Sequence, residues 1–399
     1  MSGFAPDVAR SPGNPEAYQP WGQQHNQWVL LPVLGLVALA IPGLVVLGVI
    51  STNIGVGAVL VGAMAAVLPV IPVVAAFLWV DRWEPEPSRL LLAAFLWGAG
   101  VSVLGAAVIN DTAAVLGEQV LGNGGGDLVG SVVSAPIAEE AFKGAFLVSL
   151  LWLRRREFDG VVDGIVYAGL VAAGFAFTEN ILYFGRAFAT DGLVGESGSV
   201  VIVFVVRGVL SPFAHPVFTV MIGIAVGLVV RRRNPLGTVA LPLIGYFAAV
   251  ALHALWNASA GLGFLPAVYA AIMVPLFGGL IALVVWQRRR EQRVVAAQLP
   301  RFASAGWIAP SEVPLLASLI GRRGWRSAVR HRAGERAADA VRDYQNAVTE
   351  LAFISDRVQR GTVGEETGRW HHDTLAAVMA ARDRALRTPP GLQRPGRPG

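Results

Sequence analysis

The chain has 399 residues, of which 54% are hydrophobic and 15% are charged, and its mean hydropathy is +0.56. Globular domains carry about 25% charged residues, and here the apolar residues also come in long unbroken runs. These features indicate a membrane protein with several spans, and they exclude a collagen, a disordered chain and a coiled coil. Cysteine is absent from the sequence, which excludes disulfides, thiolate nucleophiles, cysteine-ligated zinc and iron–sulfur clusters.

The net charge of +5 is distributed unevenly along the chain. Residues 288–399 hold 20 Arg and 11 Asp or Glu, a net charge of +9, whereas the remainder of the chain carries −4. The sequence has a single lysine, Lys143, and it lies within an apolar run beside two glutamates. The net positive charge therefore lies mainly in the C-terminal region. A lysine within an apolar run requires a structural or functional explanation.

Eight runs are long and apolar enough to cross a membrane, which takes about 20 residues. They are residues 28–50, 54–80, 89–110, 128–153, 160–184, 199–230, 236–259 and 264–287. We therefore expect an all-α, polytopic membrane bundle of about eight transmembrane helices, followed by a small helical C-terminal tail. The sixth run is too long for one straight span, and Arg207 with the Ser211–Pro212 step predicts a break in it. No signal peptide is expected, because residues 1–27 are polar and rich in Pro and Gly.

Three arginine triplets indicate the orientation. Residues 154–156, 231–233 and 288–290 follow the fourth, sixth and eighth runs, which all end on the same side. Because basic loops remain cytoplasmic, we expect a multi-pass protein of the plasma membrane with cytoplasmic N- and C-termini. The expected segments are a disordered cytoplasmic N-terminus (1–27), the transmembrane bundle (28–287), a basic, partly helical cytoplasmic region (288–387) and a disordered tail (388–399).

The C-terminal region contains two amphipathic patterns, at residues 313–320 and 333–358. In the second pattern, apolar residues recur at helical steps: Ala337, Val341, Tyr344, Val348 and Leu351. A small helical appendage is the first interpretation, and a basic surface for anionic lipid is the second. Nucleic acid is not an expected partner, since no nucleic-acid-recognition motif accompanies the arginines.

Ionisable residues inside the apolar runs are the candidate functional residues, because each costs about 2.5–3.5 kcal/mol at the centre of a bilayer. With nearby polar side chains they fall in four runs: Glu139, Glu140 and Lys143; Asp163, Glu179 and Asn180; Arg207 and His215; His253 and Asn257. We expect them to converge on a shared, hydrated interior.

Helical spacing allows Lys143 to reach both Glu139 and Glu140, four and three positions away. One lysine cannot neutralise two carboxylates, and a surplus carboxylate whose pKa is set by this neighbour can serve as a general base. Each motif also has a structural explanation, such as an interhelical ion pair, a packed histidine or a polar clamp between helices. Asp163 can equally mark the start of a helix. Their joint occurrence in separate spans is what indicates a functional site.

The motifs resemble those of the PrsW-type intramembrane proteases, relatives of the CAAX-processing endopeptidases and of the multi-pass subunit of gamma-secretase. The resemblance covers residues 28–287, and includes the segment from Asp81 to Pro87 and the pair Asp163–Gly164. It rests on E-E-x-x-K, F-x-x-x-E-N, a lone histidine and H-x-x-W-N, which supply the implied catalytic residues: Glu139, Glu140, Lys143, Glu179, Asn180, His215, His253 and Asn257.

The resemblance implies an endopeptidase that hydrolyses a peptide bond of a membrane-anchored protein within the lipid bilayer, an anti-sigma factor being the best-known class of substrate. In one version of the mechanism, Glu139 is the general base for a water held between it and His215. His253 and Asn257 then donate to the oxyanion, and Glu179 orients the water or assists proton transfer.

In a second version, a divalent metal, with zinc the first choice, is bound by Glu179, His215 and His253. Glu139 or Glu140 then acts as the base. On the expected topology, the side chains of Glu139, Glu179, His215 and Asn257 lie towards the extracytoplasmic side of the bundle. Two other classes stay open: a non-catalytic membrane scaffold, and a proton-coupled transporter, for which the sequence offers one broken span but no internal repeat.

Overall fold

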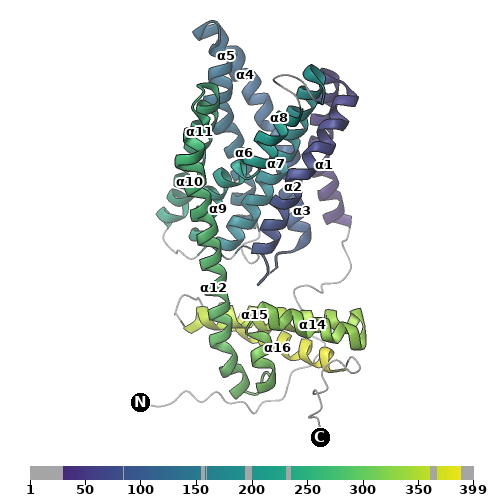
Figure 1. Ribbon diagram of the computed structural model, residues 1–399. Helices are drawn as coiled ribbons and strands as arrows, with labels where there is room; N and C mark the ends of the chain where they lie inside the picture. Colours follow the sequence, from purple (N-terminus) through teal and green to yellow (C-terminus); the bar gives the residue numbers. More distant parts are fainter. Residues whose placement is uncertain are drawn as a thin grey trace. The chain divides into compact units, whose positions relative to one another are not determined.

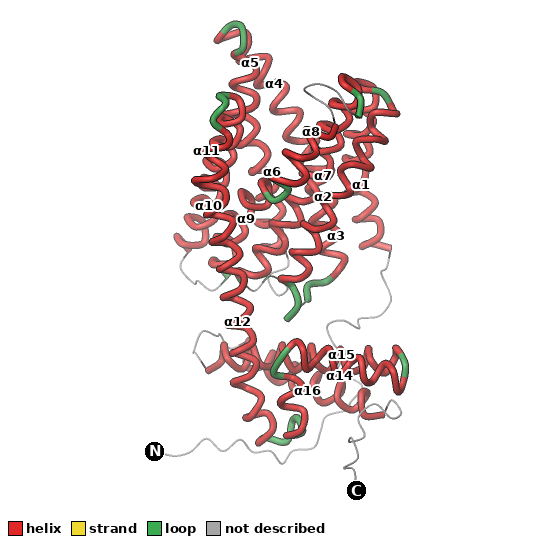
Figure 2. The backbone as a smooth tube through the Cα atoms, in the orientation of Figure 1, coloured by secondary structure: helices red, strands yellow, loops and turns green. Residues whose placement is uncertain are grey.

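The computed structural model describes residues 30–83, 85–153, 158, 160–193, 200–230, 235–359 and 366–387. Within these ranges the regular structure is entirely helical, and strands are absent (Figure 2). The chain divides into two compact units, a bundle at residues 28–287 and a second unit built from residue 288 onward. The expected disordered segments 1–27 and 388–399, and the arginine triplets 154–156 and 231–233, lie outside the described residues.

The bundle is built from long helices (Figure 1), and four of its described segments also contain a short π-helical stretch. In chain order the elements are α1 (Leu30–Ile54), α2 (Val56–Val80), α3 (Ser88–Leu96), η2 (Trp97–Ser102), α4 (Val103–Leu121), α5 (Gly125–Leu128), η3 (Val129–Ser134), α6 (Ala135–Leu153), α7 (Val161–Asp191), α8 (Val200–Phe204), η4 (Val205–Leu210), α9 (Ala214–Val229), α10 (Pro235–Gly261), α11 (Leu265–Val268), η5 (Tyr269–Met273) and α12 (Val274–Ser304).

Seven of the described helices are long and apolar enough to span a membrane. The fourth expected run forms the continuous stretch α5–η3–α6, which holds three ionisable residues close together: Glu139, Glu140 and Lys143. Successive helices alternate in direction through the bundle (Figure 1). The predicted polytopic all-α bundle is confirmed.

The predicted break in the sixth run is also present. Helix η4 ends at Leu210, the backbone turns over Ser211–Phe213, and α9 begins at Ala214. A break at this depth exposes backbone groups, and the Leu210 carbonyl oxygen accepts a hydrogen bond of 2.8 Å from the Tyr269 hydroxyl. The break sets the start of α9, and with it the position of His215.

Helix α7 is the central helix of the bundle, with 78% of its most apolar stretch buried. It packs on α2 and α9 at close backbone range, which requires small residues at the crossing points. Where α7 meets α9, a Cβ atom on Gly164 would overlap the carbonyl oxygen of Gly223, and a Cβ on Gly223 would overlap that of Gly164. These two glycines let α7 and α9 approach closely, so polar side chains on the two helices meet further along.

The second unit contains η6 (Pro310–Glu312), α13 (Val313–Leu316), α14 (Leu319–Ala333), α15 (Glu335–Gln359) and α16 (Glu366–Arg387). The pattern at 333–358 predicted α15 correctly, and its apolar positions form the buried face of that helix. The pattern at 313–320 is wrong as a single helix. The chain bends at Ala317, and the Ser318 hydroxyl caps α14 by accepting from the Gly321 N–H at 3.1 Å.

Candidate active site

Lys143 lies at the centre of a polar cluster inside the bundle, with no exposed surface. Its ammonium nitrogen is 2.9 Å from Glu140 Oε1 and 3.3 Å from Glu139 Oε2, so both contacts that the helical spacing predicts are made. The same nitrogen lies 3.8 Å from the centre of the Phe175 ring, a cation–π contact. A buried ammonium with two carboxylates satisfies its charge without water, which explains how an apolar span tolerates a lysine.

His215, at the start of α9, connects this lysine to α7. Its Nδ1 atom lies 3.2 Å from Lys143 Nζ, and its Nε2 atom lies 2.8 Å from Glu179 Oε2. An ammonium only donates and a carboxylate only accepts. Nδ1 is therefore the acceptor and Nε2 carries the proton, so its two neighbours fix one neutral tautomer of His215.

His253, on α10, lies next to the two glutamates that Lys143 contacts. Its Nδ1 donates to Glu140 Oε1 at 3.1 Å, and its Nε2 lies 3.8 Å from Glu139 Oε2. The Thr219 hydroxyl donates to Glu140 Oε2 at 2.8 Å. Glu140 thus receives hydrogen bonds from Lys143, His253 and Thr219, whereas Glu139 has only the longer contact to Lys143 and the distant His253.

Arg207, on η4, is a site residue that the sequence indicated only as a mark of the helix break or as a partner for a carboxylate. Its guanidinium donates to Glu179 Oε2 at 2.5 Å and to Asn180 Oδ1 at 2.8 Å, and it stacks 3.9 Å from the centre of the Tyr183 ring. Asn180 therefore faces Arg207 rather than the lysine. The available signal in the sequence was an arginine inside an apolar run, because an ionisable residue there is costly unless it has a partner.

Asn257 lies at the edge of the cluster, one helical turn beyond His253. Its amide nitrogen donates to the Ser131 carbonyl oxygen of η3 at 2.8 Å, and the residue is half-buried. Asp163 is not part of the cluster. Its carboxylate accepts from the Gly160 N–H at 2.9 Å and caps α7, as the helix-start interpretation predicted.

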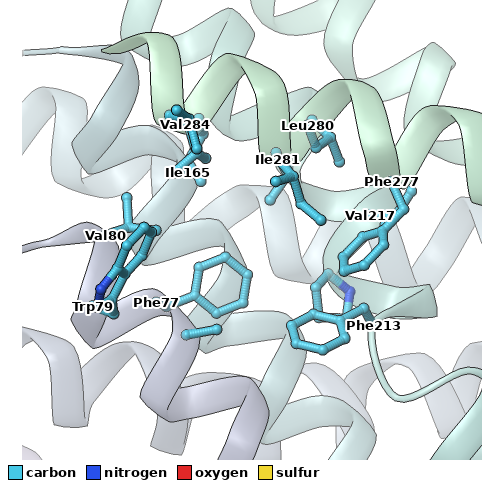
Figure 3. Close-up of a pocket in the computed structure, with 14 residues that line it drawn as sticks. Phe77, Trp79, Val80, Ile165, Phe213, Val217, Phe277, Leu280, Ile281 and Val284 are labelled. Atoms are coloured by element: carbon cyan, nitrogen blue, oxygen red, sulfur yellow. The ribbon is translucent and has the colours of Figure 1, made fainter. Parts of the chain in front are cut away.

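An apolar pocket of about 240 Å³ lies on the other side of α9 (Figure 3). Phe213, Val217 and Val220 face this pocket, while His215 and Thr219 on the same helix face the polar cluster. Apart from the Trp79 indole, the side chains that line the pocket are apolar, and none of them can activate water. The pocket is therefore not the candidate active site, although it borders the helix that carries His215.

Comparison with known proteins shows which family the bundle resembles. Residues 86–280 match the model of a family described as PrsW family intramembrane metalloprotease. This stretch of the chain is thus similar to the PrsW family. The resemblance deduced from the motifs is confirmed over this range, which contains all eight expected site residues but starts after most of the segment 81–87.

Three curated relatives carry the name Protease PrsW. The protein from Clostridioides difficile is 30% identical over 161 residues, that from Geobacillus kaustophilus 28% over 173 residues, and that from Bacillus subtilis 33% over 119 residues. These alignments cover 39%, 43% and 30% of this chain, and 62%, 68% and 51% of the relatives. No solved structure matches the chain.

The matched family is described as one of metalloproteases, so the fit of these side chains to a metal ion is relevant. Ligand atoms of Glu139, His215 and His253, from α6, α9 and α10, lie within 4.8 Å of one another. Two imidazoles and one carboxylate form a donor set typical of catalytic zinc. Each histidine also has its other nitrogen on a carboxylate, Glu140 for His253 and Glu179 for His215, which is the usual outer support of zinc-bound histidines.

The ligand set differs from the one that the sequence predicted. The structure gathers Glu139 with the two histidines, whereas Glu179 supports His215 from its far side and is bound by Arg207. The donor chemistry thus fits a divalent ion. Lys143 contacts two of the three donors, so an ion bound here would share the space with an ammonium group.

Proposed function

We propose that this chain is an intramembrane endopeptidase that hydrolyses a peptide bond of a membrane-anchored protein. The observation that carries the proposal is the convergence of Glu139, His215 and His253 around Lys143, from helices far apart in the sequence. By the family resemblance, a membrane-anchored anti-sigma factor is a suitable class of substrate. Similarity to the PrsW family supports the same chemistry.

Glu139 is the better general base of the two adjacent glutamates. A base needs a free lone pair within hydrogen-bond reach of a water molecule. The oxygens of Glu140 are occupied by Lys143, His253 and Thr219, so Glu140 orients these groups. Glu139 has spare acceptor capacity, and can take the proton from a water that lies between it and a histidine.

The histidines act as acceptors towards that water. In the tautomers fixed by their carboxylate partners, Nδ1 of His215 and Nε2 of His253 carry lone pairs that face Lys143 and Glu139. His253 in this state cannot donate to an oxyanion, so that role falls to Asn257, whose amide can turn from Ser131 towards a bound substrate. In the alternative with a metal, Glu139 would be a ligand beside His215 and His253 rather than the base, and a zinc ion held there would polarise the scissile carbonyl and lower the pKa of its water.

We propose cytoplasmic N- and C-termini and residence in the plasma membrane. Successive helices of the bundle alternate in direction (Figure 1), and the arginine-rich second unit follows Gln287 directly in the sequence. A strongly basic region next to the last span favours the cytoplasmic side. In this orientation the break before α9 and the far half of α7 lie in the outer half of the bundle, so the substrate is cut towards the extracytoplasmic side.

The proposal is tested with purified protein in lipid nanodiscs and a reporter peptide fused to a membrane anchor. Glu139→Gln and His215→Ala should abolish cleavage, whereas Thr112→Ala, an exposed hydroxyl on α4, should leave it unchanged. Wild-type turnover in the Glu139 variant would refute the assignment of the base. Solute flux without cleavage would favour the transporter, and co-purification of partners without cleavage would favour the scaffold.

A further inference from the structure

Helix α14 is unusually basic among the helices of the second unit. Over Leu319–Ala333 it carries five arginines and one histidine but no acidic residue. Helices α15 and α16 mix acidic and basic residues along their whole length. The positive charge of the second unit is thus concentrated on one helix, where it generates a local field of a single sign.

The packing of α14 determines which of its residues face outward. Arg322, Trp325 and Val329 are buried, at three- and four-residue steps, and form the inner face. Trp325 packs edge-on against Tyr344 with ring centres 6.0 Å apart. The Arg322 guanidinium donates to the Gln345 carbonyl oxygen and to the Thr349 hydroxyl on α15. This arginine acts as a structural residue, and its contacts fix the rotation of the helix.

The opposite face of α14 combines arginine with one highly exposed aliphatic residue. We call it the outer face, and define it as Ile320, Arg323, Ser327, Arg330 and His331, all of which are exposed. The Ile320 side chain is 87% exposed, the highest value of any large hydrophobic residue in the described part of the chain. Small residues intervene at Gly324 and Ala328, so a flat partner can approach the helix backbone closely.

We propose that the outer face of α14 docks on an anionic lipid surface, with Ile320 entering the headgroup region. Arginine pairs with phosphate through a planar fork, and basic helices that carry a few aliphatic residues bind in this way. The helix α12 is continuous from Val274 in the bundle to Ser304, which tethers the second unit to the membrane. Such a tether raises the effective concentration of the outer face near the lipid, so weak individual contacts suffice.

The charge of the outer face matters more than its one aliphatic residue in this proposal. Arg330 already forms an exposed ion pair with Glu335, with Nε 2.6 Å from the carboxylate, so its charge is partly neutralised. Arg323 lies nearest to Ile320 on the outer face, three positions away, and should therefore be the main lipid contact. The proposal is independent of proteolysis, since it involves neither the polar cluster nor the apolar pocket.

The absence of cysteine from the chain allows a direct test. Ile320→Cys in the full-length protein is labelled with a polarity-sensitive fluorophore and compared in neutral nanodiscs and in discs that contain phosphatidylglycerol. We expect a blue-shifted emission only in the anionic discs, reversed by about 0.5 M salt because such salt screens exposed charges. The matched label is Met379→Cys, at a 46% exposed position on α16, and it should not shift.

A charge-reversal pair separates docking from general attraction. Arg323→Glu should abolish the shift at position 320, whereas Arg342→Glu, an equal charge change on the mixed surface of α15, should preserve it. Circular dichroism and thermal unfolding check that both variants fold. An equal loss in both variants would overturn the proposal, as would an unchanged emission in anionic discs. A shift that also occurs in neutral discs would overturn it in favour of a protein contact.

Discussion

Lys143 Nζ and His215 Nδ1 lie 3.2 Å apart, although 72 positions separate the two residues in the chain. This contact joins α6 to α9, and through Glu179 and Arg207 it continues to α7 and η4. With His253 of α10, which bonds Glu140, the cluster is one hydrogen-bonded network across five helical elements rather than a set of separate pairs. In such a network the effect of a substitution depends on which partners lose their bonds.

The two adjacent glutamates should give opposite results when each is replaced by glutamine. Glu139→Gln should lower turnover by about 10²–10⁴-fold, the usual contribution of a general base, with little loss of stability. Glu140→Gln should lower the free energy of unfolding by about 1–3 kcal/mol, because it disturbs bonds to Lys143, His253 and Thr219. Reporter cleavage and thermal unfolding of the same preparations distinguish the two effects. Equal stability losses would contradict the division of roles.

Lys143→Met should be among the most destabilising substitutions in the bundle. Removal of the ammonium leaves two buried carboxylates unpaired, which costs about 3–5 kcal/mol for a buried ion pair. The double variant Lys143→Met with Glu140→Gln removes one of these charges and should recover part of the stability but none of the activity. Thermal unfolding in detergent measures the order of stabilities. A double variant less stable than Lys143→Met would contradict the prediction.

Arg207 should act as a positioning residue through Glu179 and His215. Arg207→Gln leaves Glu179 with His215 alone, and substitutions of such supporting residues cost about 10–100-fold in activity. Arg207→Lys retains a positive charge next to Glu179 and should restore part of the activity. The reporter assay measures turnover of both variants, with thermal unfolding as the check on folding. Unaltered turnover in Arg207→Gln at wild-type stability would contradict the positioning role.

Much of the bundle could be predicted because its determinants are local. Long apolar runs specify membrane helices, and the Ser211–Pro212 step specifies the break. In the second unit, α15 was predictable from the period of its buried residues. Helix α14 was not, because its buried face includes Arg322, whose burial depends on acceptors supplied by α15. Sequence patterns treat such an arginine as exposed.

The candidate site was predictable within each helix but not between helices. The contacts of Lys143 to Glu139 and Glu140 follow from helical spacing alone. Whether His215 meets Glu139 or Glu179 as a co-ligand depends on how α6, α7 and α9 cross. The crossing of α7 and α9 depends in turn on the close approach at Gly164 and Gly223, a feature without a short sequence motif. The metal set expected from the sequence therefore includes Glu179, whereas the structure brings Glu139 close to the two histidines.

Metal binding offers a direct test of the ligand set that the structure gathers. Purified protein loaded with zinc should hold one ion per chain, and His215→Ala and His253→Ala should each lose it. Glu179→Ala should weaken zinc binding by about 10–100-fold without abolishing it, since Glu179 supports His215 rather than joining the ligands. Metal content after gel filtration is the measurement, with Glu118→Gln on α4 as control. Complete loss in the Glu179 variant would restore the set expected from sequence.

The loop after α2 should make stability depend on pH. Burial raises the pKa of the Asp81 carboxyl from 3.8 to about 7, and the N–H that Glu86 donates to it at 3.0 Å opposes this only in part. Below pH 3.8 this carboxyl is protonated in both the folded and the unfolded protein, so its ionisation does not lower the free energy of unfolding. Between pH 3.8 and about 7 the unfolded chain has released this proton while the folded protein still holds it, so the free energy of unfolding falls as the pH rises and levels off above about 7.

Asp81→Asn should remove that dependence, because asparagine retains an acceptor for the Glu86 N–H but does not ionise. The variant should match the wild type near pH 4 and exceed it in stability at about pH 8. Thermal unfolding at both pH values measures the difference, with Asp111→Asn, an exposed carboxyl on α4, as the matched control. A variant less stable than the wild type at pH 8 would mean that ionised Asp81 is paired with a cation, and that the charge stabilises the loop.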